Sequence, residues 1–286
     1  MINRKSKYIF AFLSLVLIIF IPEVSSQTTG LPDKFFGVTL ENVPKDFDKS
    51  IISLRSFDKK PVARVVFDND MTASEYLKYV KKIHAVSYTM GEIEDSYEMK
   101  NLSYPDYESR ARDYVDLLSE HIDIWEAGNE INGEWNGNIT DVLEKINFSV
   151  NYCREKNKKV AMTFYYNKDC YSNPENEMFT WINNSFPVEL RSKLDYVFVS
   201  YYEDDCDGNL PDWQNVFDSL HVIFPDAKLG IGECGTRNKK AEYIKQYYSM
   251  NITTPNYVGG YFWWYFKKDC VPQTKPLWRT MNEAMK

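Results

Sequence analysis

The run Val62-Ala63-Arg64-Val65-Val66-Phe67 has the composition of a buried β-strand, and the amphipathic stretch Ser74–Ile83 follows it closely. Val is enriched in strands because its branched side chain suits a pleated surface. Within Ser74–Ile83, apolar residues recur every three or four positions, which is the spacing of a helix with one buried face. These residues predict one βα unit that carries a single charged residue, Arg64, inside its strand.

The same pattern recurs along the chain. The predicted strands start about 25 to 35 residues apart, the length of one βα unit. With Val62–Phe67, they are Phe35–Leu40, Ala85–Met90, Ile122–Ala127, Val160–Tyr165, Tyr196–Tyr202, Lys228–Gly232 and Tyr257–Tyr265. Besides Ser74–Ile83, the predicted helices are Tyr107–Glu120, Asp141–Asn157, Asp212–Phe224, Lys239–Met250 and Leu277–Met285.

Apolar strands alternating with amphipathic helices predict a parallel sheet covered by helices. Eight units favour the α/β architecture of a single (β/α)8 TIM barrel. A doubly wound open sheet is the alternative. However, the first predicted strand is followed by the segment 40–44, Leu-Glu-Asn-Val-Pro, which has no Gly-rich phosphate loop.

The first residues have the pattern of a secretory signal peptide. Arg4, Lys5 and Lys7 precede the apolar run Tyr8–Ile21, and small residues follow at 24–26. We expect cleavage after Ser26, which leaves residues 27–286 as the barrel domain of a secreted, periplasmic or extracellular protein. The apolar run is shorter than the roughly 20 residues of a transmembrane helix, so we expect no membrane attachment after cleavage. An uncleaved anchor is the alternative.

Composition narrows the function classes. The chain has 41 acidic and 34 basic residues, a net charge of −7, which argues against nucleic acid as its main partner. Aromatic residues make up 16% of the chain, more than a core needs, which leaves a surplus for a ligand cleft. The sequence gives no indication of the oligomeric state.

The cysteines and histidines show no metal-binding pattern. The sequence contains neither C-x-x-C nor H-E-x-x-H, so we predict no metal and no cofactor. Cys170 and Cys206 follow neighbouring predicted strands by similar distances, and are therefore either a rim disulfide or two free thiols. Cys234 is expected to point into packing.

Two glutamates follow predicted strands where a barrel carries its active site, at the C-terminal ends of the strands. Glu130 closes the segment 125–130, Trp-Glu-Ala-Gly-Asn-Glu, and Glu233 follows the seventh strand. Hydrolysis of a glycosidic bond needs one carboxyl to protonate the leaving oxygen, and a second to attack the anomeric carbon or to activate water. Arg64 is a suitable cation for keeping Glu233 ionised, although it could instead pair with a structural carboxylate.

Aromatic residues at the same barrel end are candidates for sugar contacts, because the faces of sugars pack on aromatic rings. Strand alternation favours Tyr202 over Tyr201, since it places Tyr202 on the side of the small Ser200. The remaining aromatic candidates are Trp135, Trp263 and Trp264. Two carboxylates after the third predicted strand, Glu92 and Asp95, are interpreted as solvated loop residues in preference to sugar ligands.

Taken together, these residues resemble the retaining glycoside hydrolases of clan A, over most of residues 35–286. The motifs that carry the resemblance are Asn129-Glu130, Glu233, Arg64, Ser200-Tyr201-Tyr202 and Trp263-Trp264. The resemblance implies that Glu130 is the acid/base and Glu233 the nucleophile. It also implies that Asn129 holds the sugar 2-hydroxyl and that Tyr202 orients the nucleophile. No one family of the clan is singled out.

The expected function is therefore that of a secreted retaining hydrolase that degrades β-linked oligo- or polysaccharide by double displacement. This mechanism predicts carboxyl groups about 5–5.5 Å apart. A noncatalytic sugar-binding barrel and a transglycosylase that uses the same residues are the alternatives. The glutamate pair argues against the first, and only product analysis separates the second from hydrolysis.

Overall fold

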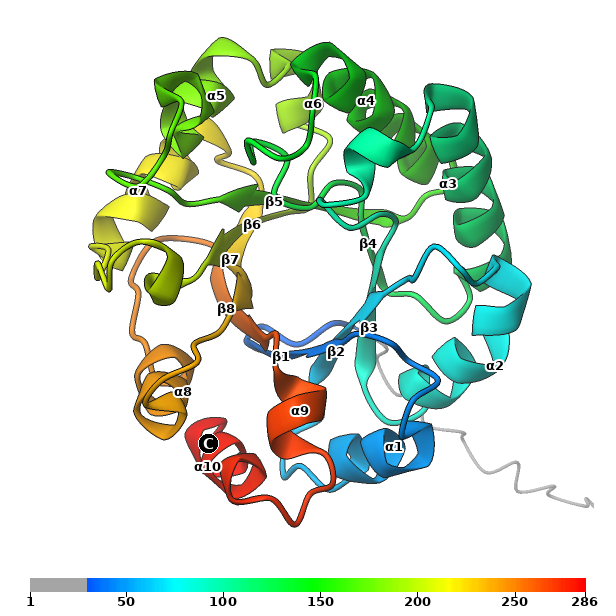
Figure 1. Cartoon of the computed structure of the whole chain (residues 1–286), viewed down its shortest axis with the longest axis vertical. Coiled ribbons are helices and arrows are strands. Elements are labelled where there is room, and N and C mark those ends of the chain that lie inside the picture. The colour runs from blue at the N-terminus through cyan, green and yellow to red at the C-terminus, as the bar shows by residue number, and fades with distance from the viewer. Residues whose placement is uncertain (1–29) are drawn as a thin grey trace, which may run out of the picture. The chain divides into compact units, whose positions relative to one another are not determined.

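The computed structural model describes residues 30–286 and places eight parallel strands side by side in chain order, with the first strand paired to the last. Figure 1 shows the closed ring of strands with the helices outside it. The predicted (β/α)8 barrel is confirmed, and the open sheet is excluded. The predicted signal peptide, residues 1–26, lies outside the described residues. No helix within residues 30–286 is long and apolar enough to cross a membrane.

The strands are β1 Phe35–Leu40, β2 Val62–Val66, β3 Tyr88–Glu92, β4 Ile124–Glu126, β5 Lys159–Tyr165, β6 Tyr196–Tyr201, β7 Lys228–Cys234 and β8 Tyr257–Trp263. The helices are α1 Phe47–Arg55, α2 Ala73–His84, α3 Tyr104–Leu118, α4 Ile139–Glu155, α5 Met178–Asn184, α6 Val188–Arg191, α7 Trp213–Ile223, α8 Lys240–Tyr248, α9 Phe266–Cys270 and α10 Pro276–Ala284. Short 3-10 turns lie at η1 Met99–Asn101, η2 Pro174–Asn176 and η3 Glu203–Asp205.

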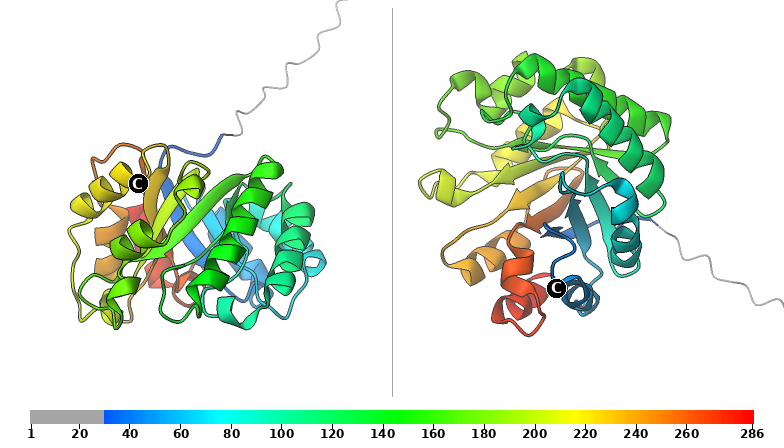
Figure 2. Two further views of the ribbon diagram at one scale, coloured as in Figure 1. Left: turned by 90° about the horizontal axis from the view of Figure 1, so that it is seen from above. Right: turned by 45° about the vertical axis from the view of Figure 1, so that its right-hand side comes forward.

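Two apolar layers hold the barrel together. Side chains that point outward from the strands pack against the helices, which run along the outside of the barrel in Figure 2. Side chains that point inward form a second cluster within the ring. Its fully or nearly buried members are Phe35, Val62, Met90, Ile124, Ala161, Tyr196, Phe198, Val258 and Phe262.

The barrel interior changes from apolar to polar toward the C-terminal mouth, the end at which the strands finish. Because side chains alternate along a strand, the residue two positions after an inward-facing one also faces inward. In five strands that residue is polar and fully buried. The five are Arg64, Glu92, Glu126, Thr163 and Ser200. This polar layer is the floor of the mouth.

One predicted boundary was wrong in a way that affects the site. The third strand was expected at 85–90, but α2 continues to His84 and the chain then turns, with Val86 and Ser87 donating to the Ile83 carbonyl. The strand therefore starts at Tyr88 and ends at Glu92. As a result, Glu92 belongs to the barrel wall and not to the loop that follows it.

Candidate active site

A pocket of about 410 Å³ opens at the C-terminal mouth. Both predicted glutamates line it, so residues from β7 and from the loop after β4 face one cavity. The full lining is Asp95, Ser96, Tyr97, Asn129, Glu130, Trp135, Tyr165, Tyr202, Asp205, Glu233, Trp264 and Tyr265. The pocket thus combines carboxylates, which can transfer protons, with aromatic walls.

Glu233 is 5% exposed and has two strong hydrogen-bond donors. Arg64 Nη1 donates to Oε2 at 2.8 Å, and the Tyr202 hydroxyl donates to Oε1 at 2.6 Å. A bulge in β7 sets this orientation, because Val199 pairs with Ile231 whereas Ser200 pairs with Glu233. The extra residue is Gly232, where a Cβ would lie 2.5 Å from the Phe198 side chain. Only glycine fits there.

Glu130 is also 5% exposed, but its partners are neutral. Ser200 Oγ donates to Oε1 at 2.5 Å and Ser96 Oγ donates to Oε2 at 2.9 Å. The backbone of Glu130 has a φ of 46°, a left-handed conformation that is costly for a residue with a side chain. Asn136 Nδ2 donates to the Glu130 carbonyl at 2.8 Å, and so helps to hold this turn.

Arg64 is buried beneath the pocket and contacts three carboxylates. Besides Glu233, its Nε donates to Glu126 Oε2 at 2.6 Å, and its Nη2 lies 3.1 Å from Glu92 Oε1. Glu126 also accepts a hydrogen bond from Thr163. Arg64 therefore contacts both the candidate nucleophile and structural carboxylates, the two roles that the sequence left open.

Two members of this network were mispredicted or missed. Glu92, expected to be a solvated loop residue, is fully buried because β3 ends two residues later than predicted. Glu126 was not considered at all, although strand alternation from the inward-facing Ile124 places it inside the barrel. A charged residue within an apolar strand was the available signal, as it was for Arg64.

Burial raises the pKa of both candidate catalytic carboxyls, that of Glu130 to about 7 and that of Glu233 to about 8. Hydrogen bonds from Ser200 and Ser96 oppose this rise at Glu130. At Glu233 the Arg64 charge and the Tyr202 hydroxyl oppose it, whereas the negative charge of Glu130 adds to it. The pair therefore retains a proton near neutral pH.

The contacts favour Glu130 as the holder of that proton, although burial raises the pKa of Glu233 further. The positive charge of Arg64 favours the ionised form of Glu233, and the Glu233 oxygen that faces Arg64 must be unprotonated because a guanidinium can only donate hydrogen bonds. Serine hydroxyls can donate or accept, so the oxygens of Glu130 accommodate a proton without losing a partner. The two carboxyls thus have the different surroundings that an acid and a nucleophile require.

Comparisons with known proteins concern the barrel. No protein-family model and no curated protein sequence matches the chain. A Bacteroides uniformis β-glucuronidase structure is similar, with a TM-score of 0.56 and 16% identity over 81% of this chain and 30% of that chain. Saccharomyces cerevisiae Gas2p in complex with laminaritriose and laminaritetraose has a TM-score of 0.55 and 12% identity, over 88% of this chain and 64% of that chain. The likeness is one of fold. This chain spans less than two thirds of either protein.

The pocket brings together most of the residues predicted for sugar contacts. Asn129 lines it with its side chain 1% exposed, and Asn129 Oδ1 has no hydrogen-bond partner among the described residues. Trp264 forms one wall and lies over Arg64, with 5.9 Å from the guanidinium carbon to the ring centroid. Trp135 forms another, and its Nε1 donates to Ser96 at 2.9 Å.

Two predicted contacts lie outside the pocket. Tyr201 and Trp263 face the helices. Each comes one residue before a side chain that faces the mouth, Tyr202 or Trp264, and successive side chains along a strand point to opposite sides. The Tyr201 hydroxyl donates to the Asn209 carbonyl at 2.6 Å, and Trp263 Nε1 donates to Asp269 at 3.1 Å. Both side chains are fully buried in the outer core.

Further residues from loops and from the end of β5 complete the lining and were not predicted. Tyr97 is 63% exposed and stacks on Trp135, with ring centroids 5.4 Å apart. Tyr165, Asp205 and Tyr265 also line the pocket. Tyr165 and Tyr265 fall within or at the end of predicted strands, so aromatic residues at strand ends were the available signal. The loop conformation that carries Tyr97 and Asp205 has no comparable signature.

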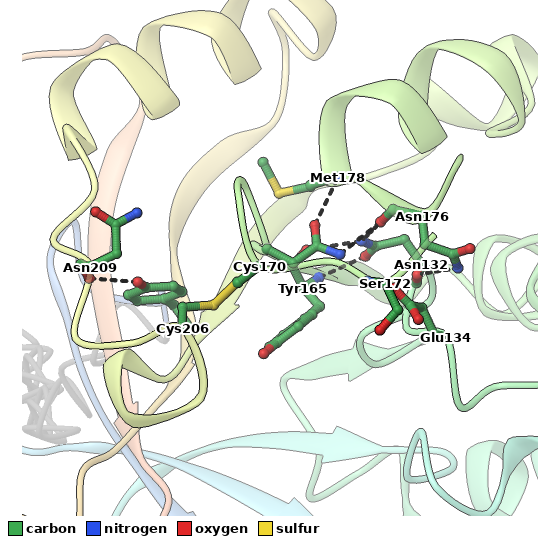
Figure 3. The surroundings of a disulfide bond; sticks show 11 residues. Asn132, Glu134, Tyr165, Cys170, Ser172, Asn176, Met178, Cys206 and Asn209 are labelled. Atoms are coloured by element: carbon green, nitrogen blue, oxygen red, sulfur yellow. Dashed lines mark hydrogen bonds between the residues drawn. A yellow bond between two sulfur atoms is a disulfide. The ribbon is translucent and has the colours of Figure 1, made fainter. Parts of the chain in front are cut away.

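A disulfide joins the loops that follow β5 and β6. Figure 3 shows Cys170 bonded to Cys206, so the free-thiol alternative is wrong. The segment after Cys170 is also tied to the loop after β4, because the backbone N–H groups of Ser172 and Asn173 donate to Glu134. Cys234 is buried, as expected. Within residues 30–286, no cluster of acidic, His and Cys side chains has the arrangement of a metal site.

Proposed function

We propose that this protein is a glycoside hydrolase that cleaves β-linked oligo- or polysaccharide, with Glu233 as nucleophile and Glu130 as acid/base. One observation carries the proposal. Two buried glutamates line a single pocket at the barrel mouth, one bonded to a guanidinium and a tyrosine hydroxyl, the other to two serines. The similarity in fold to a β-glucuronidase, and to a protein solved with laminarin oligosaccharides, supports it.

The contacts suit a double displacement. Glu233, ionised against Arg64, attacks the anomeric carbon, while Glu130 gives its proton to the departing oxygen. A glycosyl-enzyme ester forms on Glu233. Glu130, now ionised, removes a proton from a water molecule, which attacks the anomeric carbon and releases Glu233. The product then keeps the β configuration of the substrate.

Other lining residues hold the sugar. The orphaned Asn129 Oδ1 accepts a hydrogen bond from a sugar hydroxyl, which satisfies a buried acceptor that otherwise costs free energy. Tyr202 keeps the Glu233 carboxylate oriented. Trp264 and Trp135 pack on the faces of sugar rings.

A secreted protein fits the same proposal. Polysaccharide substrates lie outside the cell, and disulfides such as Cys170–Cys206 form and persist in oxidising compartments. We propose that residues 1–26 are removed on export and that residues 27–286 form the catalytic domain.

The test is a screen of purified protein against β-linked polysaccharides and oligosaccharides, with product size and the anomeric configuration of the first product scored by NMR. Glu233→Gln should retain the fold and lose at least about three orders of magnitude in kcat, because the covalent route is removed. Glu242→Gln, on an exposed turn of α8, is the matched control and should have wild-type activity.

The outcomes separate the alternatives. A β product first supports retention, whereas an α product first contradicts a covalent intermediate on Glu233. Near-normal turnover by Glu233→Gln would refute the assignment. Sugar binding without any product from the wild-type protein would indicate a noncatalytic barrel, and transfer to an added acceptor would indicate a transglycosylase.

A further inference from the structure

A second pocket, of about 340 Å³, continues the candidate active site on one side. The two pockets share Asp95 and the wall residue Trp264. The remaining lining of the second pocket comes from the end of β2 and from the loops after β1, β2 and β3. It consists of Glu41, Val66, Phe67, Asp68, Asn69, Glu94 and Glu98. We call this the acidic pocket, because five of its lining residues are carboxylic acids.

The negative charge of the acidic pocket is only partly neutralised. No Lys, Arg or His of the described residues lines either pocket. Two cations lie close to carboxylates of the acidic pocket without lining it. Arg110 Nε lies 2.9 Å from Glu94 Oε2, and Lys267 shares a neighbouring pocket with Glu41. Asp68 and Glu98 have neutral hydrogen-bond partners, the Tyr76 hydroxyl and the Asn101 amide.

Glu94 provides a buried acceptor in this pocket. Its side chain is 1% exposed, and neither carboxylate oxygen has a well-formed hydrogen bond among the described residues, although the Asn69 side chain and the Asp95 backbone interact with it weakly. The Arg110 ion pair engages Oε2 and leaves Oε1 without a well-formed hydrogen bond. Burial raises the pKa of Glu94 to about 7, although Arg110, the Asn69 side chain and the Asp95 backbone oppose the rise. A ligand that brings N–H or O–H donors and a positive charge would satisfy it.

We propose that the acidic pocket is an additional subsite that selects sugars by charge, binding a protonated amino sugar in preference to a neutral sugar and rejecting a uronate. Trp264 supplies an aromatic face on the side shared with the catalytic pocket. At mildly acidic pH Glu94 is mostly protonated, because its pKa is about 7. The other carboxylates of the acidic pocket attract an ammonium group on the ring and repel a ring carboxylate. This inference rests on the proposed function for its choice of ligand class, and it predicts a substrate unlike a glucuronide.

The experiment compares matched oligosaccharides that have one β linkage type and differ only in the sugar: glucosamine, glucose or glucuronic acid. Binding is measured by calorimetry on Glu233→Gln, which consumes no substrate, at about pH 5.5, where amines are protonated and uronates ionised. We expect the Kd to rise in the order glucosamine, glucose, glucuronic acid. A higher salt concentration should reduce the differences in Kd among the three oligosaccharides, because salt screens interactions between charges.

Variants connect the preference to the pocket. Adding Asp68→Asn and Glu98→Gln should reduce the glucosamine-to-glucuronate affinity ratio by about tenfold or more, the effect of removing two carboxylates a few ångströms from the ligand charge. Asp33→Asn with Asp226→Asn is the control. Both of these exposed residues precede strands, at the opposite barrel end, and the pair removes the same net charge. That control should leave the ratio unchanged.

Several results would overturn the inference: a uronate that binds as tightly as the amino sugar, a ratio unaffected by Asp68→Asn with Glu98→Gln, or an equal change in the control pair. Failure of the proposed function is a separate result. It would appear as wild-type protein that releases no product from any of the three oligosaccharides, while the binding order still reports on the charge preference.

Discussion

Removal of one hydroxyl tests the proposed role of the strand-six tyrosine. In Tyr202→Phe the ring remains, and only the donor to Glu233 Oε1, at 2.6 Å, is lost. That hydrogen bond stabilises the ionised carboxylate and lowers the pKa of Glu233. Without it the pKa of Glu233 must rise, and less of the protein carries the proposed nucleophile in its ionised form at a given acidic pH.

The size of the effect follows from the kind of bond. A hydrogen bond to a charged group contributes about 1.5–3 kcal/mol. At about 1.4 kcal/mol per pKa unit, its loss raises the pKa of Glu233 by roughly one to two units. The acidic limb of the kcat/KM profile should therefore move up by roughly one to two pH units. On that limb, kcat/KM should fall by about 10- to 100-fold.

The measurement is kcat/KM across the pH range for wild-type protein, Tyr202→Phe and the control Tyr201→Phe. The Tyr201 hydroxyl binds the Asn209 carbonyl outside the pocket, so its loss should cost about 1 kcal/mol of stability and leave the pH profile unchanged. Equal shifts in the two variants, or an unmoved acidic limb in Tyr202→Phe, would refute the reasoning.

Three further predictions use other contacts. The negative charge of Asp95 raises the pKa of Glu130, so Asp95→Asn should lower it and move the basic limb of kcat/KM to lower pH; a limb that moves upward contradicts this sign. Replacing Cys170 and Cys206 by serine should lower the free energy of unfolding, measured in urea, by about 4 kcal/mol, because the disulfide closes a loop of 36 residues. A decrease below about 1 kcal/mol would contradict the loop-entropy estimate. Trp264→Ala should raise KM with little change in Tm, whereas Trp263→Ala should cost about 3–5 kcal/mol and leave KM unchanged; the reverse pattern would contradict their placement.

The barrel could be predicted because its signal is repetitive. Each strand is a short apolar run, and an error of two residues in one strand leaves the count and order intact. Boundaries were less predictable, since they depend on local contacts. β3 starts and ends later in the chain than predicted, because α2 continues to His84 and the turn after it is closed by hydrogen bonds to the Ile83 carbonyl. The short helices α5, α6 and α9 carry too few turns for a periodic signal.

The candidate site was predictable where it lies on strands and unpredictable where it lies on loops. Glu233 lies near the C-terminal end of β7 and Glu130 follows β4, so topology alone brings them to one mouth. Alternation placed Tyr202 on the pocket side. Trp263 was included among the predicted sugar contacts because the side that each of the two neighbouring tryptophans faces was left open. Tyr97 lies on a loop, where no regular alternation of side chains allows its direction to be predicted from the sequence.

The buried polar layer under the pocket has a consequence for Glu233, the proposed nucleophile. One Arg64 charge faces three carboxylates, and an unpaired charge in this setting would cost several kcal/mol. Burial raises the pKa of Glu92 well above its usual range, against the opposing charge of Arg64. Glu92, Glu126 and Glu233 thus share one guanidinium. Because Arg64 is shared, it lowers the proton affinity of Glu233 less than an arginine paired with that carboxylate alone would. A carboxylate of higher proton affinity is the stronger nucleophile.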